Sequence, residues 1–421
     1  MTTPANPAKT PKPARTPLPF EVWALVAGGF AVALGYGVVA PAIPQFALEF
    51  GVSNFAASAI VSAFALMRLV SAPLAGWAVA RMGERRTYTI GILIVAVSTG
   101  AAALAANYPQ FVLLRGAGGI GSTLFTVAAT ALLAKVSPVE SRGRVASLNA
   151  AGFLLGGLFG PVLGGVVAVF GLRAPFVFYF FTLLVAAAIV AIALRGSQAA
   201  GAPGISGANG TRGNSASSSG VDAGADTDLS LKRAMLVPQF RTLLFSVFSF
   251  GWASYGVRVS LIPLLVAVTF GGDATMAAWI LAAYAAGNAV FIFPAGRWTD
   301  TIGRKPMLVV GLSILAVAYA AMGIAPSMWV LGAIMLVAGA GSALANPGQQ
   351  AVLADVLAKR RGGGPVAAYS MASDLGGVLG PALAGLVVDL AGFSWAFVLT
   401  AVLLAAAASV WSLSRDSRSL A

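Results

Sequence analysis

Residues 156–165 read Gly-Gly-Leu-Phe-Gly-Pro-Val-Leu-Gly-Gly, and residues 376–385 read Gly-Gly-Val-Leu-Gly-Pro-Ala-Leu-Ala-Gly. These two decapeptides lie 220 residues apart in the chain. The same offset relates another pair of glycines, Gly76 and Gly83, to Gly296 and Gly303. Because the motifs and the spacing between them both recur, the sequence indicates a tandem duplication. It predicts two structurally similar halves.

The composition places the duplicated unit in a membrane. Apolar residues make up 58% of the 421 residues and charged residues only 9%, whereas about a quarter of a soluble domain is charged. The chain contains no cysteine and no histidine, which excludes disulfides, thiol nucleophiles, imidazole bases and the usual zinc ligands. Proton chemistry therefore falls to carboxylates and tyrosines, and we expect no metal site.

Twelve apolar stretches approach the ~20 residues with which a helix crosses a bilayer. They are residues 20–46, 54–80, 87–106, 109–133, 145–170 and 175–194 in the first half, and 240–268, 275–296, 306–324, 327–353, 366–390 and 393–413 in the second. We therefore predict an all-α integral membrane protein with two pseudo-symmetric six-helix bundles, residues 20–195 and 240–414. Residues 1–19 and 415–421 are predicted to be tails, the first of them disordered, and the Gly- and Ser-rich residues 196–239 a flexible linker.

Lysine and arginine are distributed unevenly among the loops. The two ends, the linker and the even-numbered loops hold 22 of the 26 basic residues, whereas Arg173 is the only one in the odd-numbered loops. The positive-inside rule then predicts that both termini and the linker are cytosolic, in a multi-pass protein of the cell membrane. The net charge of +13 thus follows from topology and does not indicate a nucleic-acid partner.

The repeated glycine pairs belong to a longer motif. Residues 296–305 fit the pattern Gly-x-x-x-Asp-x-x-Gly-[Arg/Lys]-[Arg/Lys]. With this motif and the six-plus-six layout, the chain resembles the major facilitator superfamily. The resemblance implies a cytosolic gate, and a basic loop that only sets topology is the alternative. The gate residues of the motif are Gly296, Asp300, Gly303 and Arg304, with Gly76 and Gly83 in the first half.

The first-half copy of the motif carries inverted charges. Glu84 stands where the 220-residue offset places Arg304, and Lys135 stands where it places Asp355. We therefore expect an Arg304–Asp355 contact in the second half of the chain. In the first half we expect a Glu84–Lys135 contact with the charges exchanged.

The decapeptide and the first apolar stretch carry a narrower resemblance. Residues 152–165 resemble the helix-five motif of antiporters in the superfamily, and residues 34–44 resemble an element of its twelve-helix drug/proton antiporters. The resemblance implies a monomeric transporter that needs no cofactor and uses a proton gradient. Simple tight packing of helices is the alternative explanation for the motif residues, which are Gly152, Gly156, Gly160, Pro161, Gly164 and Gly165.

Four ionisable side chains, Arg68, Arg115, Arg258 and Asp374, fall within the predicted spans. A charge at this depth is costly enough to indicate function. Arg115 matches a helix-four Arg-x-x-x-Gly motif that the family links to proton movement. Asp374 is the only carboxylate at this depth, and we assign proton coupling to it and Arg115; a permanent structural ion pair is the alternative. Three arginines against one aspartate predict a cavity that favours anionic or neutral amphiphiles over cations.

A set of residues is assigned to the substrate cavity from its helix positions. Together they would form an apolar and aromatic wall with a few polar groups, although aromatic residues in membrane helices more often pack or face lipid. The set comprises Tyr36, Arg115, Phe125, Asn149, Tyr255, Arg258, Tyr284, Asn288, Asn346 and Gln349.

Our leading prediction is the export of small amphiphilic molecules by proton antiport through alternating access. The substrate, protons and membrane lipids are the expected partners. A dedicated exporter of a metabolite, sugar or lipid-like anion is the alternative, and a membrane receptor or scaffold that transports nothing is a remote one. We predict no enzymatic activity, because membrane enzymes use clustered histidines or paired carboxylates that this sequence lacks.

Overall fold

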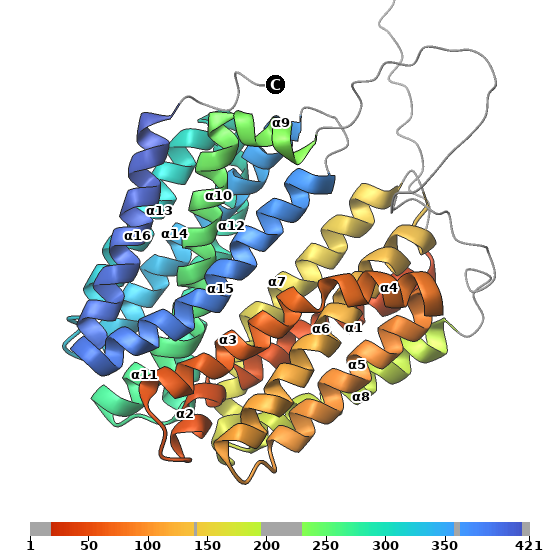
Figure 1. Cartoon of the computed structure of the whole chain (residues 1–421), viewed down its shortest axis with the longest axis horizontal. Coiled ribbons are helices and arrows are strands. Elements are labelled where there is room, and N and C mark those ends of the chain that lie inside the picture. The colour runs from red at the N-terminus through yellow and green to blue at the C-terminus, as the bar shows by residue number, and fades with distance from the viewer. Residues whose placement is uncertain (1–17, 139–140, 195–229, 358–362, 415–421) are drawn as a thin grey trace, which may run out of the picture.

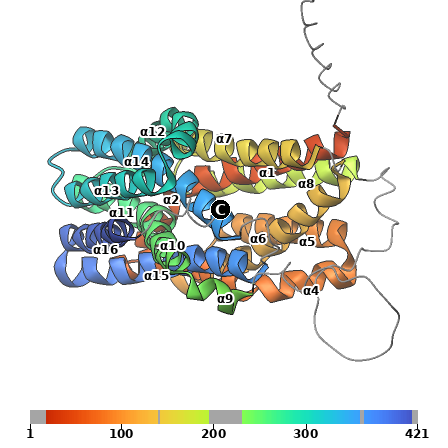
Figure 2. The ribbon, with the colours of Figure 1, turned by 90° about the horizontal axis from the view of Figure 1, so that it is seen from above.

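The computed structural model describes residues 18–138, 141–194, 230–357 and 363–414. The predicted tails lie almost entirely outside these ranges, and so does the predicted linker up to residue 229. All regular secondary structure in the described ranges is helical. The helices form two bundles that lie side by side (Figure 1 and Figure 2).

The first bundle contains six membrane crossings, two of which are broken. Its helices are α1 (Phe20–Val39), α2 (Ala42–Leu48), α3 (Asn54–Val70), α4 (Ala72–Met82), α5 (Glu84–Ala102), α6 (Tyr108–Val136), α7 (Arg142–Ala168) and α8 (Ala174–Ala193). α1 and α2 form one crossing that is interrupted at Ala40 and Pro41, because a proline removes a backbone donor and clashes with the preceding turn. α3 and α4 form another crossing with a bend of 47°.

The second bundle repeats this layout. Its helices are α10 (Pro238–Phe250), the π-helix η3 (Gly251–Val257), α11 (Arg258–Phe270), α12 (Ala274–Thr301), α13 (Arg304–Met322), α14 (Met328–Leu357), α15 (Gly363–Ala391) and α16 (Phe393–Leu413). α10, η3 and α11 form one continuous crossing. The short helix α9 (Leu231–Leu236) precedes them, in a segment that the sequence predicted to be linker. That part of the prediction is wrong, because Ala234 is fully buried in the core of the second bundle.

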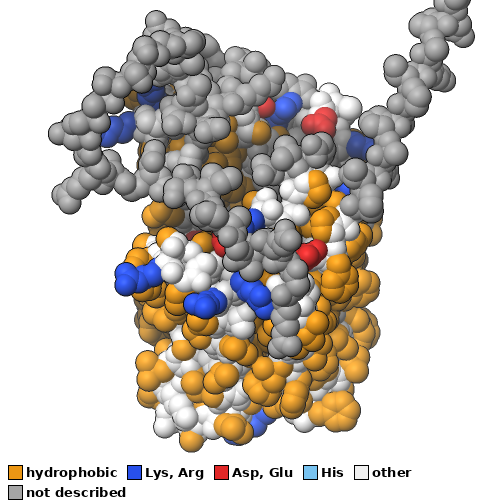
Figure 3. All heavy atoms as spheres, turned by 90° about the vertical axis from the view of Figure 1, so that its right-hand side faces the viewer, with side chains coloured by type: hydrophobic (Ala, Val, Ile, Leu, Met, Phe, Trp, Pro, Cys, Tyr) orange, Lys and Arg blue, Asp and Glu red, His pale blue; other side chains and the backbone are white. Residues whose placement is uncertain are grey.

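The helices have the length and composition of membrane spans. Ten of the described helices, and the bent α3–α4 pair as an eleventh, are long and apolar enough to cross a bilayer. The remaining crossing is α5, whose first turn carries Glu84, Arg85 and Arg86. Hydrophobic side chains cover the lower flank in Figure 3, and lysines and arginines gather above them. The predicted all-α fold with twelve crossings is therefore confirmed.

The two bundles touch mainly near one end. We call the end where α1 begins and α16 ends the termini face, and the other end the opposite face. Gln45 on α2 donates from Nε2 to the Pro263 carbonyl on α11 at 3.0 Å. The carboxylate of Asp389 on α15 accepts from the Asn54 and Phe55 amides at the start of α3, at 3.1 and 2.9 Å. These contacts close the opposite face, whereas the bundles splay apart toward the termini face (Figure 1).

The interface between the bundles obeys the 220-residue repeat. Gly165 on α7 faces Ala278 on α12, and the equivalent Gly385 on α15 faces the equivalent Ser58 on α3. A Cβ atom at Gly385 would overlap Ser58 Oγ, so that this close approach depends on glycine. The last glycine of each decapeptide therefore joins the two bundles.

Candidate functional site

Arg115 lies in the interior of the first bundle, near the bundle interface. It is on α6 and is only 3% exposed. Its guanidinium sits over the Phe64 ring on α3, 4.7 Å from the ring centre. Its Nε has no hydrogen-bond partner among the described residues. A buried charge is costly unless it is paired, and the cation–π contact with Phe64 offsets part of that cost.

Arg258 is held in a comparable way in the second bundle. It follows the π-helix η3, and its guanidinium lies 4.2 Å from the centre of the Tyr284 ring on α12. Its Nε donates to the Ser254 carbonyl at 3.0 Å. The Tyr284 hydroxyl is within 3.2 Å of Ser254 Oγ, which fixes the ring under the guanidinium. Arg258 is half-buried, and in the described part of the chain its two Nη atoms have no protein partner.

The two aromatic platforms are related by the internal repeat. Phe64 and Tyr284 are 220 residues apart and lie on the equivalent helices α3 and α12. The arginines above them come from helices that are not equivalent, α6 and α11. Each bundle thus holds one arginine over one aromatic ring, but the two arginines come from helices that the repeat does not relate.

Asp374 faces Arg68 across the bundle interface. α3 and α15 run antiparallel, and Ser58 packs beside Gly385. Arg68 lies ten residues after Ser58 on α3, and Asp374 lies eleven residues before Gly385 on α15. Because both helices rise by the same distance per residue, Arg68 and Asp374 lie at about the same level. The two charges act on each other electrostatically, although no ion pair within 4.0 Å joins them in the described structure. Sequence reasoning gave Arg68 no role, because no motif marks it.

The tyrosines near these charges line the space between the bundles. Tyr255 on η3 is 50% exposed, and Arg258, Asp374 and Arg68 are all within electrostatic reach of it. In the first bundle, Tyr36 on α1 stacks on Phe64 with ring centres 6.0 Å apart. The assignment of both tyrosines to the substrate cavity stays a prediction.

Other residues assigned to the cavity have different surroundings. Phe125 is 2% exposed and packs on Tyr88 in the core of the first bundle, so its assignment is wrong. Asn288 bonds Gly339 and Ser342 and ties α12 to α14. Asn149 lies against Gly29 of α1, and Asn346 accepts from Gln350.

Gln349 is 1% exposed, and within the described ranges its Nε2 has no hydrogen-bond partner. Such residues are wrongly assigned to a cavity for a general reason. Lipid and protein core are both apolar, so the sequence does not tell which face of a membrane helix points inward.

The π-helix η3 was not predicted. It places Ser254, Tyr255 and Arg258 at the site, and π-turns of this kind often occur at functional sites. A Cβ atom at Gly251 would overlap the Ser373 carbonyl of α15, and one at Gly256 would lie 2.8 Å from Pro381 Cδ. In the sequence, these two glycines were the signal from which η3 could have been predicted, because they mark where α15 approaches its backbone.

The predicted charge contacts at the termini face are present. Lys135 Nζ lies 3.4 Å from Glu84 Oε2. Arg304 Nε lies 3.1 Å from Asp355 Oδ2, and its Nη2 donates to Oδ1 at 3.2 Å. Each pair joins two helices of one bundle, α5 to α6 and α13 to α14, as the sequence predicted.

The gate glycines have two different environments. Gly83 and Gly303 precede the helices α5 and α13 with φ values of 81° and 135°, which L-residues rarely adopt. A Cβ atom at Gly76 or Gly296 would meet nothing within 4 Å. Asp300 is exposed on α12. Only the second glycine of each pair is therefore required by backbone geometry.

The helix-five motif packs α7 closely on α1. Cβ atoms at Gly156 and Gly160 would lie 2.7 Å from Ala33 Cβ and Gly37 Cα, and one at Gly164 would lie 2.8 Å from the Val38 carbonyl. Gly152 has more room, with Val26 Cγ1 3.3 Å away. Pro161 lies within α7 without ending it. The motif residues thus shape the bundle and do not contact the charged site.

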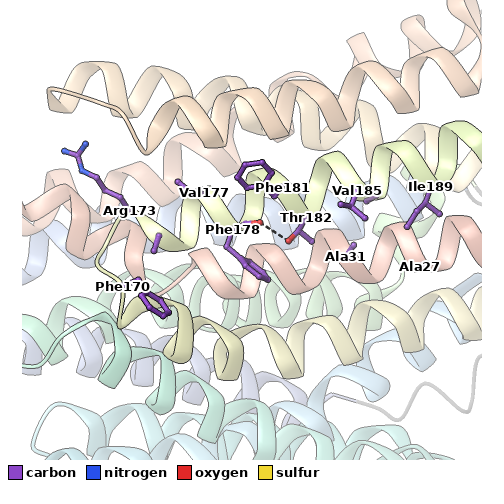
Figure 4. Close-up of a pocket in the computed structure, with 12 residues that line it drawn as sticks. Ala27, Ala31, Phe170, Arg173, Val177, Phe178, Phe181, Thr182, Val185 and Ile189 are labelled. Carbon is purple, nitrogen blue, oxygen red and sulfur yellow. Dashed lines mark hydrogen bonds between the residues drawn. The ribbon is translucent and has the colours of Figure 1, made fainter.

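A separate hollow lies on the outer flank of the first bundle, between α1 and α8 (Figure 4). It has a volume of about 760 Å³ and a mostly apolar lining that includes Phe170, Phe181 and Val185. The Thr182 hydroxyl in its wall donates to the Phe178 carbonyl at 2.9 Å. Its shallow apolar surface suits lipid chains.

Comparisons with known proteins agree with this architecture. The model of the Major Facilitator Superfamily matches residues 25–261 and 243–420. Multidrug resistance protein 2 of Bacillus subtilis is 31% identical over 163 residues, which are 39% of this chain and 41% of that protein. Quinolone resistance protein NorA of Staphylococcus aureus is 28% identical over 38% of this chain. The matched segment covers 41% of the length of each of these relatives.

Solved structures show the same fold at low sequence identity. A bacterial homologue of the human lysosomal transporter Spinster, in an inward-facing and unoccupied conformation, superposes with a TM-score of 0.76 at 19% identity, covering 95% of this chain and 97% of that one. A D-xylose–proton symporter gives 0.67 at 17% identity, covering 94% of this chain and 98% of that one.

Proposed function

The chain belongs to the Major Facilitator Superfamily, and we propose that it exports small amphiphilic molecules in exchange for protons by alternating access. The family and the fold are those of membrane transporters. Multidrug efflux is supported by the names of the two relatives, which match under half of the chain. The observation that carries the proposal is the place of Asp374, a carboxylate within the span of α15, where that helix packs against α3 of the other bundle and Arg68 lies within electrostatic reach.

Asp374 is suited to carry the proton. It lies near the middle of α15, and no other carboxylate occurs at that depth in a described span. Its partner Arg68 belongs to the other bundle, so that a change in the charge of Asp374 changes an attraction between the bundles. Arg115 completes the assignment on the side of the first bundle. The proton gradient serves as the energy source, and no cofactor is required.

The orientation of the cycle follows from the loops. If the basic loops lie in the cytosol, as the positive-inside rule requires, the termini face is cytosolic and the protein sits in the cell membrane. The contacts at the opposite face then describe a state that is closed to the outside. This is the state in which an exporter collects substrate from the cytosol or the inner leaflet. We propose that a monomer completes the cycle.

The proposal is tested in proteoliposomes with a fluorescent quinolone and an imposed proton gradient. We expect concentrative uptake in wild type and none in Asp374→Asn, which retains counterflow of unlabelled against labelled substrate. Asp273→Asn is the matched control, because Asp273 caps α12 at the opposite face and an asparagine keeps that cap. Concentrative transport by Asp374→Asn would remove Asp374 from the mechanism.

A dedicated exporter of a metabolite, sugar or lipid-like anion is the second candidate. The excess of arginine over carboxylate between the bundles favours it. It is separated from multidrug export by the range of substrates that one preparation moves. A receptor or scaffold would move none of them under any gradient.

A further inference from the structure

We infer that the substrate is an amphiphilic anion whose charged group binds the Arg258 guanidinium, with Arg115 supplying a second positive charge from the other bundle. This inference deepens the proposed transport function and rests on it. It goes beyond Multidrug resistance protein 2 and NorA, whose names give no substrate charge. Its basis is the charge balance between the bundles.

The balance leaves two arginines uncompensated. Of the four interior charges, only Asp374 is acidic, and among the arginines it is Arg68, across the α3–α15 interface, that acts on it electrostatically. The remaining charges are Arg115 and Arg258, and neither has a carboxylate within salt-bridge distance in the described structure. Charges inside a membrane protein normally pair with one another or with backbone carbonyls, and they mark the pathways of substrates and ions. A bound anion would supply the missing partner.

Arg258 is prepared to bind a planar or tetrahedral anion. Its Nε is occupied by the Ser254 carbonyl, and one face of the guanidinium is occupied by Tyr284. The two Nη groups remain as a fork, the geometry with which arginine binds carboxylate, sulfonate or phosphate through two hydrogen bonds. The irregular backbone of η3 fixes this fork before substrate arrives, which lowers the cost of binding.

Arg115 gives independent support from the first bundle. It is nearly completely buried, and its Nε lacks a partner among the residues that the structure describes. Tyr36 and Tyr179 lie within its electrostatic reach. The exposed ring of Tyr255 lies within electrostatic reach of Arg258 and offers an apolar face to a hydrocarbon tail. The site therefore combines a cationic end with an aromatic wall, as an amphiphilic anion requires.

The test uses three probes with the same decyl chain: decanesulfonate, decyltrimethylammonium and decyl glucoside. Binding to the full-length protein in lipid nanodiscs is measured by equilibrium dialysis. We expect decanesulfonate to bind at least tenfold more tightly than decyltrimethylammonium. Arg258→Gln is expected to weaken decanesulfonate binding tenfold or more, and to leave binding of the ammonium probe unchanged.

Two further variants separate charge from structure. Arg258→Lys keeps the charge but loses the fork, so we expect an intermediate loss for decanesulfonate. Arg173→Gln is the matched control, because Arg173 also stacks on a ring, Phe46, and bonds the Ala103 carbonyl, yet lies at the opposite face. It is expected to keep the wild-type preference. Equal or tighter binding of the ammonium probe by wild type, or unchanged sulfonate binding in Arg258→Gln, would overturn the inference.

Flux measurements distinguish this failure from failure of the proposed function. If proteoliposomes transport the ammonium or glucoside probe but not the sulfonate, the protein is a transporter and the anion inference is wrong. If decanesulfonate binds with the expected arginine dependence but none of the probes is moved, the site assignment stands and the export function is wrong.

Discussion

Asp389 holds the opposite face closed by capping a helix of the other bundle. Its Oδ1 accepts from the Asn54 backbone amide at 3.1 Å and from Asn54 Nδ2 at 3.0 Å, and its Oδ2 accepts from the Phe55 amide at 2.9 Å. The carboxylate therefore satisfies free amides at the positive start of α3. The repeat places Val169 at the equivalent position of the first bundle, so this contact occurs on one side of the interface only.

The Asp389→Asn variant removes the charge and one accepting oxygen. An asparagine can still accept from one of the two backbone amides, so the loss is the second acceptor and the negative charge at the positive start of α3, a charge that contributes about 1 kcal/mol. The exposure of Asp389 argues against a larger value. All of this energy is lost when the bundles separate at the opposite face, because donor and acceptor belong to different bundles. We therefore expect the ratio of open to closed opposite faces to rise about fivefold, the ratio that corresponds to about 1 kcal/mol.

The assay exploits the absence of cysteine from the chain. Spin labels on Phe170→Cys and Ile324→Cys occupy exposed loops at the opposite face, one in each bundle. Their distance distribution in nanodiscs is expected to gain a longer component in Asp389→Asn. Asp273→Asn serves as the control, since Asp273 caps its own helix at the same face. A distribution identical to that of wild type would refute the reasoning.

Two further predictions follow from the repeat. Gly385→Ala is expected to open the opposite face, because its Cβ overlaps Ser58 Oγ, whereas Gly165→Ala leaves 3.3 Å to its nearest neighbour and is expected to be milder; the same spin labels measure both. Reversing Glu84 or Lys135 alone is expected to lower the thermal stability and the flux of the reconstituted protein, and exchanging the two charges is expected to restore both. A double variant no better than the single ones would show that the pair at 3.4 Å is dispensable.

The sequence predicted the helices of this protein better than it predicted which side of each helix faces the protein interior. The duplicated decapeptide predicted two halves, and the apolar stretches predicted twelve crossings. The exchange of charges across the repeat predicted the Glu84–Lys135 contact that the structure contains. Glycine was informative because its position marks where two backbones meet, as at Gly385. Phe125 was wrongly assigned to the cavity because phenylalanine occurs in the protein core, against lipid and in cavity walls alike. The turn at η3 was missed because apolar periodicity does not distinguish a π-turn from an α-helix.

Proton antiport and an anionic substrate make opposite electrostatic demands on Asp374. A proton that neutralises Asp374 leaves Arg68 uncompensated, and the added positive potential strengthens the binding of an anion. Direct competition between the proton and such a substrate is therefore impossible at this site. An antiporter of anions needs the proton to act on the equilibrium between open and closed bundles instead.

The position of Asp374 allows this indirect coupling. Asp374 and Asp389 both lie on α15 and both attract α3 of the other bundle, through Arg68 and through Asn54. Tyr255 on η3 is the other titratable group that faces Asp374. A proton on Asp374 thus weakens the same interface as Asp389→Asn does. The Asp374→Asn variant is expected to lengthen the Phe170–Ile324 label distance while binding decanesulfonate at least as tightly as wild type. Weaker decanesulfonate binding with an unchanged distance distribution would show that Asp374 contacts the substrate and does not control the bundles.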